Sequence, residues 1–332
     1  MKFKVKLQVI NYVIRSRFRM AHYPLAIRWN ITNKCVFNCV YCNTGSAFLA
    51  QQGKGELKTK EVLLILKQIS HCGVIRISFS GGEPMMREDI EKIITHCADT
   101  GIGAEMNSTG KYIPARVKEL RKISLLKLSL DGSKELHESV KRGVRFEDVT
   151  KAADACIRQD IKFTFCATIT KHNVRHLDSI LDIARFYNTI VAFQPVHPLF
   201  EAPNAINNYY PSPIELRAAV EMLIRKKREG SRHIRNSLLG LRYLYNWPDY
   251  PKLRCWAGKV FCMINPDGTL MPCDRITYNL KLPNCIDGGF IKAFRGLPLI
   301  KKCSGCAFCG TLELNFLMSY KHRGVDLIRR YV

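Results

Sequence analysis

Residues 26–42 read AIRWNITNKCVFNCVYC, a β-rich run that is followed at once by three cysteines. Cys35, Cys39 and Cys42 have the spacing C-x3-C-x2-C, with no fourth cysteine nearby. A structural zinc site normally has four protein ligands and a closed shell. The triplet therefore indicates either a distant fourth ligand or a metal centre with one coordination position left open.

The run at 26–32 is the first of six β-rich segments. The others lie at 74–80, 103–107, 125–130, 162–169 and 189–196, and helix-period stretches separate them at 59–70, 87–99, 146–159 and 174–187. This alternation predicts βαβ crossovers and a parallel sheet, followed by a helix that starts near Pro213. We expect an α/β fold, an open six-stranded barrel, in which function gathers at the carboxyl ends of the strands.

Two further motifs lie at such strand ends. The second run ends in SFSGGEP (78–84), and the fourth ends in LSLDG (128–132). Together with the cysteine triplet after the first strand, and in this order, they resemble the radical S-adenosylmethionine (radical SAM) enzymes. The resemblance covers about residues 24–230 and implies a partial (β/α)6 TIM-like barrel.

The resemblance also implies cofactors and their ligands. Cys35, Cys39 and Cys42 would bind a 4Fe-4S cluster whose open iron is chelated by SAM. The residues that it assigns to the SAM site are Tyr41, Gly81, Gly82, Glu83, Pro84, Asn107, Ser129, Asp131 and Thr168. In this set the GGE stretch would meet the methionine amino group, and Ser129 and Asp131 would lie near the ribose. An electron from a donor such as flavodoxin or ferredoxin would cleave SAM to a 5'-deoxyadenosyl radical, which takes a hydrogen atom from the substrate.

A second group of cysteines lies near the end of the chain. Residues 255–273, CWAGKVFCMINPDGTLMPC, resemble the opening of the SPASM and Twitch extensions of radical SAM enzymes, with PDG as a hairpin turn, and KKCSGCAFCG (301–310) supplies later cysteines. The full SPASM pattern is not matched, so the resemblance favours one auxiliary 4Fe-4S cluster. Its expected ligands are Cys255, Cys273, Cys306 and Cys309, with Cys262 and Cys303 as substitutes. Two clusters, or a structural zinc ribbon, are the alternatives.

Four segments are expected along the chain. They are a basic amphipathic segment at 1–24, the radical SAM core at 25–230, a linker helix and joint at 231–250, and an auxiliary-cluster domain with a C-terminal helix at 251–332. The joint is placed at NWPDYP (246–251) because that stretch is rich in turn-forming residues.

Composition limits the function classes. The 332 residues include 52 Lys and Arg against 28 Asp and Glu, a formal net charge of +24 that attracts anions. No apolar run of about 18 residues and no secretory signal is present, so we expect a cytoplasmic protein. Its fourteen cysteines are then metal ligands or thiols rather than disulfides. The solitary cysteines are interpreted as small buried hydrophobes: Cys72, Cys97, Cys156 and Cys166.

The first 20 residues form an amphipathic pattern. Val9, Ile10, Val13, Ile14 and Phe18 alternate with Lys4, Arg15, Arg17 and Arg19. Such a segment either lies on an anionic membrane surface, which would favour a lipid or isoprenoid substrate, or packs its apolar stripe on the barrel bottom.

The expected activity is an oxidative modification of a peptide or a small molecule, assisted by the auxiliary cluster; methyl or adenosyl transfer is the other outcome considered. His197, Pro198, Tyr209 and Tyr210 are candidates for the substrate mouth or for loop packing. A zinc-containing nucleic-acid binder is the alternative from another class, and we expect no nucleic-acid partner for the enzyme.

Overall fold

The computed structural model describes residues 3–17, 23–42, 55–196, 208–273, 281–298, 300 and 305–319. Six parallel strands form an open barrel: β1 (Ala26–Thr32), β3 (Arg76–Gly81), β4 (Gly103–Ser108), β5 (Leu125–Ser129), β7 (Phe163–Ile169) and β8 (Val191–Pro195). All six predicted strands are confirmed, and their ends differ from the prediction by at most two residues.

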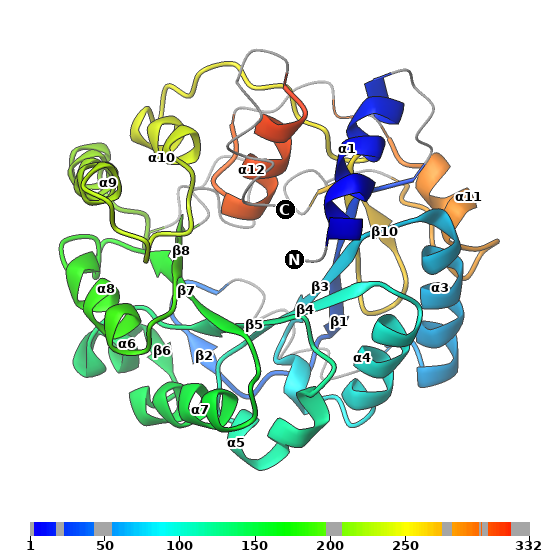
Figure 1. Ribbon diagram of the computed structural model, residues 1–332, viewed down its shortest axis with the longest axis horizontal. Helices are drawn as coiled ribbons and strands as arrows, with labels where there is room; N and C mark the ends of the chain where they lie inside the picture. The colour runs from blue at the N-terminus through cyan, green and yellow to red at the C-terminus, as the bar shows by residue number, and fades with distance from the viewer. Residues whose placement is uncertain are drawn as a thin grey trace.

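Helices surround the sheet (Figure 1). They are α3 (Thr59–Cys72), α4 (Ile90–Asp99), α5 (Ile113–Arg116), α6 (Lys134–Val140), α7 (Phe146–Arg158), α8 (Leu177–Phe186), α9 (Pro213–Arg228) and α10 (Leu238–Tyr245), with 3-10 turns η1 (Pro84–Met86) and η2 (Val117–Leu120). In α3, Val62, Ile65 and Ile69 recur at helical spacing and are buried. Helix α9 begins at Pro213, as predicted, because Ser212 and Glu215 form a capping box there.

The strands have different outer and inner faces. In β3, Ile77 and Phe79 are fully buried, whereas Arg76 and Ser78 are partly exposed and lie on the opposite face, toward the barrel interior. Strands β4 and β5 alternate in the same way. The outer faces therefore supply the apolar contacts with the helices, and the interior of the barrel is polar.

The C-terminal segment extends this sheet. Strand β9 (Phe261–Ile264) pairs in parallel with β1, and β10 (Leu270–Met271) returns antiparallel to β9, which confirms the predicted hairpin. The pairing with β1 was not predicted. The sheet order is β10-β9-β1-β3-β4-β5-β7-β8. Helix α11 (Phe290–Arg295) contacts α3, and α12 (Cys309–Leu317) contacts β8 and α10 on the open side of the barrel (Figure 1).

Helix α1 (Phe3–Arg17) forms where the amphipathic segment was predicted. Tyr12 is buried, and its hydroxyl donates hydrogen bonds to the carbonyls of Tyr23 (2.8 Å) and Lys259 (3.2 Å). Because Tyr23 and Lys259 precede β1 and β9, α1 lies near the amino ends of these strands.

The apolar residues of α1 differ in exposure. Val9 is buried, whereas Leu7, Ile10 and Ile14 are 51%, 39% and 51% exposed. The side chains of Lys4, Arg15 and Arg17, together with Phe18 and Arg19, lie outside the described residues. No helix in the described part of the chain has the length and apolarity needed to cross a bilayer.

Candidate functional site

The cysteine triplet lies on a loop that follows the carboxyl end of β1. Within it, β2 (Asn38–Cys39) pairs antiparallel with β6 (Lys141–Arg142), so that Cys39 lies opposite Lys141. The Cys42 amide donates to the Cys39 carbonyl at 3.1 Å, and the loop is anchored by Phe37, which is 2% exposed. All three predicted ligands therefore lie on one short segment that the β2–β6 pairing and the buried Phe37 fix in place.

The three thiols are close enough to affect one another. Burial raises the pKa of Cys35 to about 11, and Glu83, Cys42 and Cys39 contribute in the same direction. Among the described residues, no three Cys, His, Asp or Glu side chains converge as the ligands of a single ion do. A 4Fe-4S cluster provides a separate iron for each thiolate, so its ligands do not converge on one point. The donor set and its half-buried setting fit a cluster.

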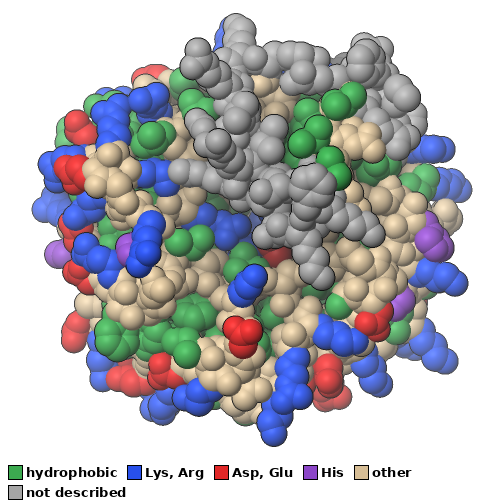
Figure 2. Space-filling view, in the orientation of Figure 1, with side chains coloured by type: hydrophobic (Ala, Val, Ile, Leu, Met, Phe, Trp, Pro, Cys, Tyr) green, Lys and Arg blue, Asp and Glu red, His purple; other side chains and the backbone are tan. Residues whose placement is uncertain are grey.

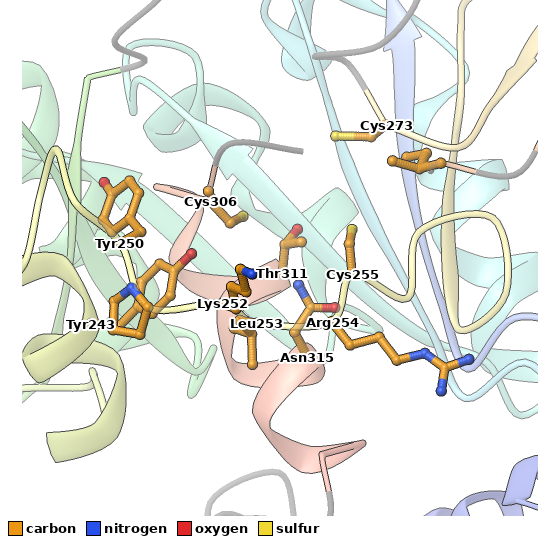
Figure 3. A pocket seen from close by; sticks show the side chains of 13 residues that line it. Tyr243, Tyr250, Lys252, Leu253, Arg254, Cys255, Cys273, Cys306, Thr311 and Asn315 are labelled. Carbon is orange, nitrogen blue, oxygen red and sulfur yellow. The ribbon is translucent and has the colours of Figure 1, made fainter. Parts of the chain in front are cut away.

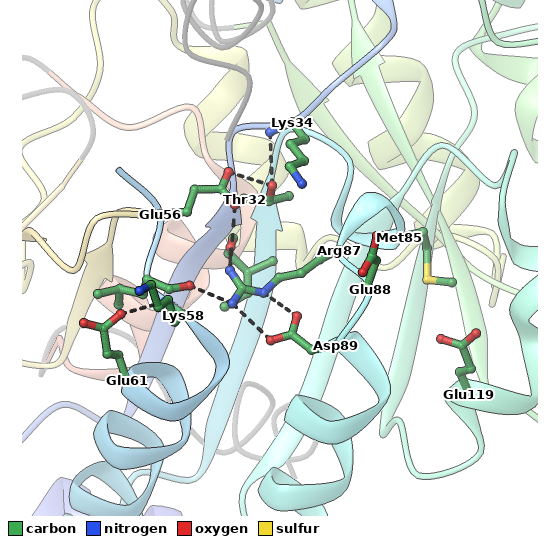
Figure 4. A network of polar contacts seen from close by, with 12 residues as sticks. Thr32, Lys34, Glu56, Lys58, Glu61, Met85, Arg87, Glu88, Asp89 and Glu119 are labelled. Carbon is green, nitrogen blue, oxygen red and sulfur yellow. Dashed lines mark hydrogen bonds and ion pairs between the residues drawn. The ribbon is translucent and has the colours of Figure 1, made fainter. Parts of the chain in front are cut away.

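A polar network fixes the segment that leads into the cysteine loop (Figure 4). The buried Arg87 guanidinium donates to the carbonyls of Ile31 and Leu57, both at 2.8 Å. Glu56 accepts hydrogen bonds from the Thr32 hydroxyl (2.8 Å) and from the backbone amide of the next residue (2.5 Å). These contacts were not foreseen from the sequence.

The two glycines of the GGE stretch lie directly against the cysteine loop. A Cβ at Gly82 would lie 2.1 Å from the carbonyl oxygen of Lys34, and one at Gly81 would lie 2.3 Å from that of Thr32. The Gly82 amide also donates to the Thr32 carbonyl at 2.8 Å. Only glycine fits this approach of the two backbones, so the strand end and the cysteine loop form one unit. Contact of these glycines with SAM stays a prediction.

Glu83 joins β3 to β4. Its side chain is 1% exposed and accepts hydrogen bonds from the Ser108 hydroxyl (2.8 Å), the Thr109 amide (2.8 Å), the Thr109 hydroxyl (2.9 Å) and the Met85 amide (3.2 Å). Burial raises the pKa of Glu83, although these hydrogen bonds oppose the shift. A carboxylate offers about four acceptor sites, so Glu83 is already engaged in positioning the turn that continues into Pro84.

Asp131 holds the cysteine loop from the end of β5. It is fully buried; Oδ2 accepts from the Tyr41 hydroxyl at 2.5 Å and lies 3.4 Å from the Lys141 ammonium, and Oδ1 accepts from the Thr168 amide at 2.8 Å. Burial and Asp131 raise the pKa of Tyr41 well above its usual value, which keeps the phenol protonated as the donor. Asn173 adds bonds to the carbonyls of Asp131 and Thr168 (2.7 and 2.9 Å).

Asp131, one of the predicted SAM-site residues, thus connects strands β5 and β7 to the cysteine loop. Its contact with the ribose of SAM stays a prediction. Asn107 and Ser129 lie at the ends of β4 and β5, partly buried. The carboxyl ends of β1, β3, β4, β5 and β7 therefore meet around the cysteine loop.

The family follows from comparison with known proteins. Residues 29–186 match the model of the Radical SAM superfamily. This segment of the chain is a radical SAM domain. Enzymes of this superfamily use a 4Fe-4S cluster and SAM.

The similarity to individual radical SAM proteins extends beyond the core. The mycofactocin maturase MftC of Mycobacterium ulcerans (strain Agy99) is 24% identical over 304 residues, which are 86% of this chain and 80% of that protein. The PqqA peptide cyclase of Bradyrhizobium diazoefficiens is 28% identical over 264 residues, 75% of this chain and 66% of that protein. Streptococcus suis SuiB, solved with its precursor peptide SuiA, matches with a TM-score of 0.68 and 18% identity. The match covers 85% of this chain and 66% of SuiB, so the chain spans about two thirds of that protein.

The structure brings three of the four predicted auxiliary-cluster ligands together. Cys255, Cys273 and Cys306 line one cavity of about 340 Å³, and Figure 3 shows their sulfur atoms directed toward the same space. Tyr250 and Arg254 also line it. The three thiols and the space that they line fit a cluster site.

The fourth ligand is not settled by this cavity. Cys309 is not among the described residues that line it; its amide donates to the Gln194 side chain on β8 at 3.2 Å, and burial raises the pKa of its thiol. Cys262 is buried in β9, with Cys285 close enough to affect its pKa. Cys303 lies outside the described residues. Cys309 as a ligand stays a prediction.

The four residues predicted for the substrate mouth or for loop packing differ in their surroundings. Tyr210 is buried and packs against Trp247 with ring centroids 4.4 Å apart, which is loop packing. Tyr209 is partly exposed and lies beneath the Lys171 ammonium, 5.6 Å from its ring centroid. His197 and Pro198 lie outside the described residues.

Proposed function

We propose that this protein is a peptide-modifying radical SAM enzyme with one auxiliary 4Fe-4S cluster. The observation that supports this most strongly is the meeting of the cysteine loop, the GGE turn and Asp131 at the carboxyl ends of neighbouring strands. When bound, the cluster and SAM supply a 5'-deoxyadenosyl radical that abstracts a hydrogen atom. The chain's own part is to hold, orient and shield the reactants.

The ligands are assigned from the thiols. Cys35, Cys39 and Cys42 hold the SAM-binding cluster and leave one iron for SAM. Cys255, Cys273 and Cys306 hold the auxiliary cluster, with Cys309 or Cys303 as the fourth ligand. Burial raises the pKa values of Cys35 and Cys39, so cluster binding must displace protons from these two thiols.

A peptide is proposed as the substrate because of the extent of the similarity. The matches to a maturase, to a peptide cyclase and to a structure that holds a precursor peptide cover 86%, 75% and 85% of this chain. Because residues 1–250 make up about three quarters of the chain, the matches to the maturase and to SuiB must also include part of the auxiliary region, 251–332. In this proposal the auxiliary cluster accepts the electron that remains on the substrate after hydrogen abstraction.

The electron donor is proposed to be an acidic protein such as ferredoxin or flavodoxin. The net charge of +24 favours an anionic partner, and Lys and Arg side chains are spread widely around the face in Figure 2.

Anaerobic iron counting with a SAM-cleavage assay tests the proposal. The reconstituted chain should hold about eight irons and form 5'-deoxyadenosine with dithionite, and replacing Cys35, Cys39 and Cys42 by alanine should remove about four irons and all cleavage. Alanine at Cys255 and Cys273 should also remove about four irons but leave SAM cleavage intact. Zinc in place of iron, or intact SAM after reduction, would contradict the assignment.

A further inference from the structure

The barrel interior carries charged side chains where α/β barrels usually hold apolar layers. Lys127 on β5 places its ammonium 2.5 Å from Glu105 Oε2 on β4 and 3.0 Å from the Ser78 hydroxyl on β3. Arg76 reaches the other carboxylate oxygen at 3.5 Å. The side chains of Arg76, Glu105 and Lys127 are 23%, 12% and 16% exposed. Burying charge costs stability, so this set is better explained by a function than by folding.

Positive charge dominates this set. Arg235 enters at the edge of β8, where its amide donates to the Val191 carbonyl at 2.8 Å. Burial raises the pKa of Glu105, but Lys127, Arg76 and Arg235 outweigh burial and lower it to about 2. Three cations therefore act on one carboxylate.

Two more charged residues border the interior. Arg28 is in register with Ser78, and its guanidinium lies 5.7 Å from the ring centroid of Phe308. Glu313 on α12 accepts a hydrogen bond from the Ser237 amide at 2.8 Å. With both included, four cations and two carboxylates border the interior among the described residues named here, so this set carries a net positive charge.

These charged side chains lie a short distance below the strand ends, where the cysteine loop is located. Lys127 and Glu105 each precede the last inward-facing residue of their strand, Ser129 or Asn107, by two positions. At about 3.3 Å per residue, the charges lie roughly 7 Å below the strand ends. An anchored group there would leave carbons a few bonds away at the level of the cysteine loop.

We propose that Arg76, Lys127 and Arg235 bind a carboxylate of the substrate inside the barrel. This rests on the proposed radical SAM function, which places hydrogen abstraction at the strand ends. An ammonium has three N–H donors, of which Glu105 and Ser78 engage two, and guanidinium groups match carboxylates in shape and charge. Glu105 cancels part of the positive charge, which suits a singly charged carboxylate better than a phosphate dianion. The carboxylate comes from a peptide C terminus or from an acidic side chain.

Anaerobic equilibrium dialysis of the reconstituted full chain with SAM tests this site. The probes are N-acetyl-Ala-Gly-Ala as the free acid, the same peptide as its C-terminal amide, and N-acetyl-Ala-Glu-Ala amide. The free acid or the glutamate peptide should bind about tenfold more tightly than the neutral amide, as expected for one charge-assisted contact. Preference for the first assigns the C terminus and preference for the second assigns an acidic side chain. Equal affinity of all three would overturn the proposal.

Single substitutions test whether the interior cations cause the preference for acidic peptides. Lys127→Met should weaken the preferred acidic probe about tenfold without changing the affinity for the neutral amide. Because this variant leaves Glu105 with one partner fewer, Arg76→Gln, which keeps the Lys127–Glu105 pair, provides a second test with the same expected direction. Lys122→Met is the matched control, since it breaks a 2.8 Å pair with Asp99 on the surface. An acid preference retained in both interior variants would refute the site.

Failure of this inference is distinguishable from failure of the proposed function. Dithionite-driven formation of 5'-deoxyadenosine without any peptide reports on the cluster and SAM alone. Cleavage without an acid preference would refute the carboxylate site and leave the radical SAM assignment standing. No cleavage by the wild-type chain would refute the assignment, whatever the peptides do.

Discussion

The buried carboxylate of Asp131 allows a direct test of how the cysteine loop is held. Asp131→Asn keeps the shape of the side chain but leaves the Lys141 ammonium, which is 7% exposed and 3.4 Å away, without its countercharge. Removing one member of a buried ion pair costs about 3–5 kcal/mol. An asparagine amide has a single acceptor oxygen, so only one of the Tyr41 hydroxyl and the Thr168 amide keeps its acceptor. We therefore expect a loss well inside this range, about 4 kcal/mol of the unfolding free energy.

Urea unfolding of the cluster-free chain measures this loss, and iron content after reconstitution shows whether the loop still binds its cluster. Glu147→Gln is the control, because it breaks the 2.6 Å pair with Lys134 between half-exposed side chains, which solvent screens. Adding Lys141→Met to Asp131→Asn should recover part of the stability, since replacing both members of a buried pair is often neutral. Equal, small losses in Asp131→Asn and Glu147→Gln would refute this account.

Three other predictions follow from single contacts. Gly82→Ala should prevent the cysteine loop from binding its cluster, because the added Cβ would lie 2.1 Å from the Lys34 carbonyl oxygen. Gly296→Ala is the control, because its Cβ would have 3.5 Å of space and the iron content after reconstitution should not change. A normal iron content in Gly82→Ala would contradict this account of the packing. Burial lowers the pKa of His137 from 6.5 to about 4, so the unfolded chain takes up the proton first and stability should fall by about 2 kcal/mol between pH 7 and pH 5. His137→Asn should remove that pH dependence in urea titrations, and an unchanged slope would exclude His137 as its source. Ser212→Ala should cost about 1 kcal/mol in calorimetry through loss of the cap of α9, and no change in melting temperature would show that the cap is dispensable.

The barrel was predictable because each core strand carries its own local signal. In β3, Ile77 and Phe79 alternate with Arg76 and Ser78, and a helix with one apolar face follows. The pairing of β9 with β1 has no such signal, since its four residues join a partner more than 200 positions earlier. Only the unpaired edge that an open barrel leaves at β1 selects that partner.

The candidate site divides in the same way. The cysteine triplet and Glu83 are set by motifs, but their partners Ser108 and Lys141 are ordinary polar residues that only the tertiary fold brings into contact. Spacing could not separate the two C-x2-C pairs that share Cys306. The start of α12 at Cys309 places that amide against β8 instead of in the auxiliary cavity, a consequence of helix placement that no spacing rule contains.

The auxiliary region also acts on the shape of the barrel. Its hairpin extends the β1 edge, and α12 contacts β8 at the opposite edge. Cys255 and Cys273 flank the hairpin strands, and Cys306 precedes α12, yet all three line one cavity. A cluster bound there would covalently connect both edges across the open side, because each thiolate bonds to the same iron–sulfur unit. On the proposed function, loss of such a cluster would therefore remove a connection between the two edges of the barrel as well as an electron acceptor.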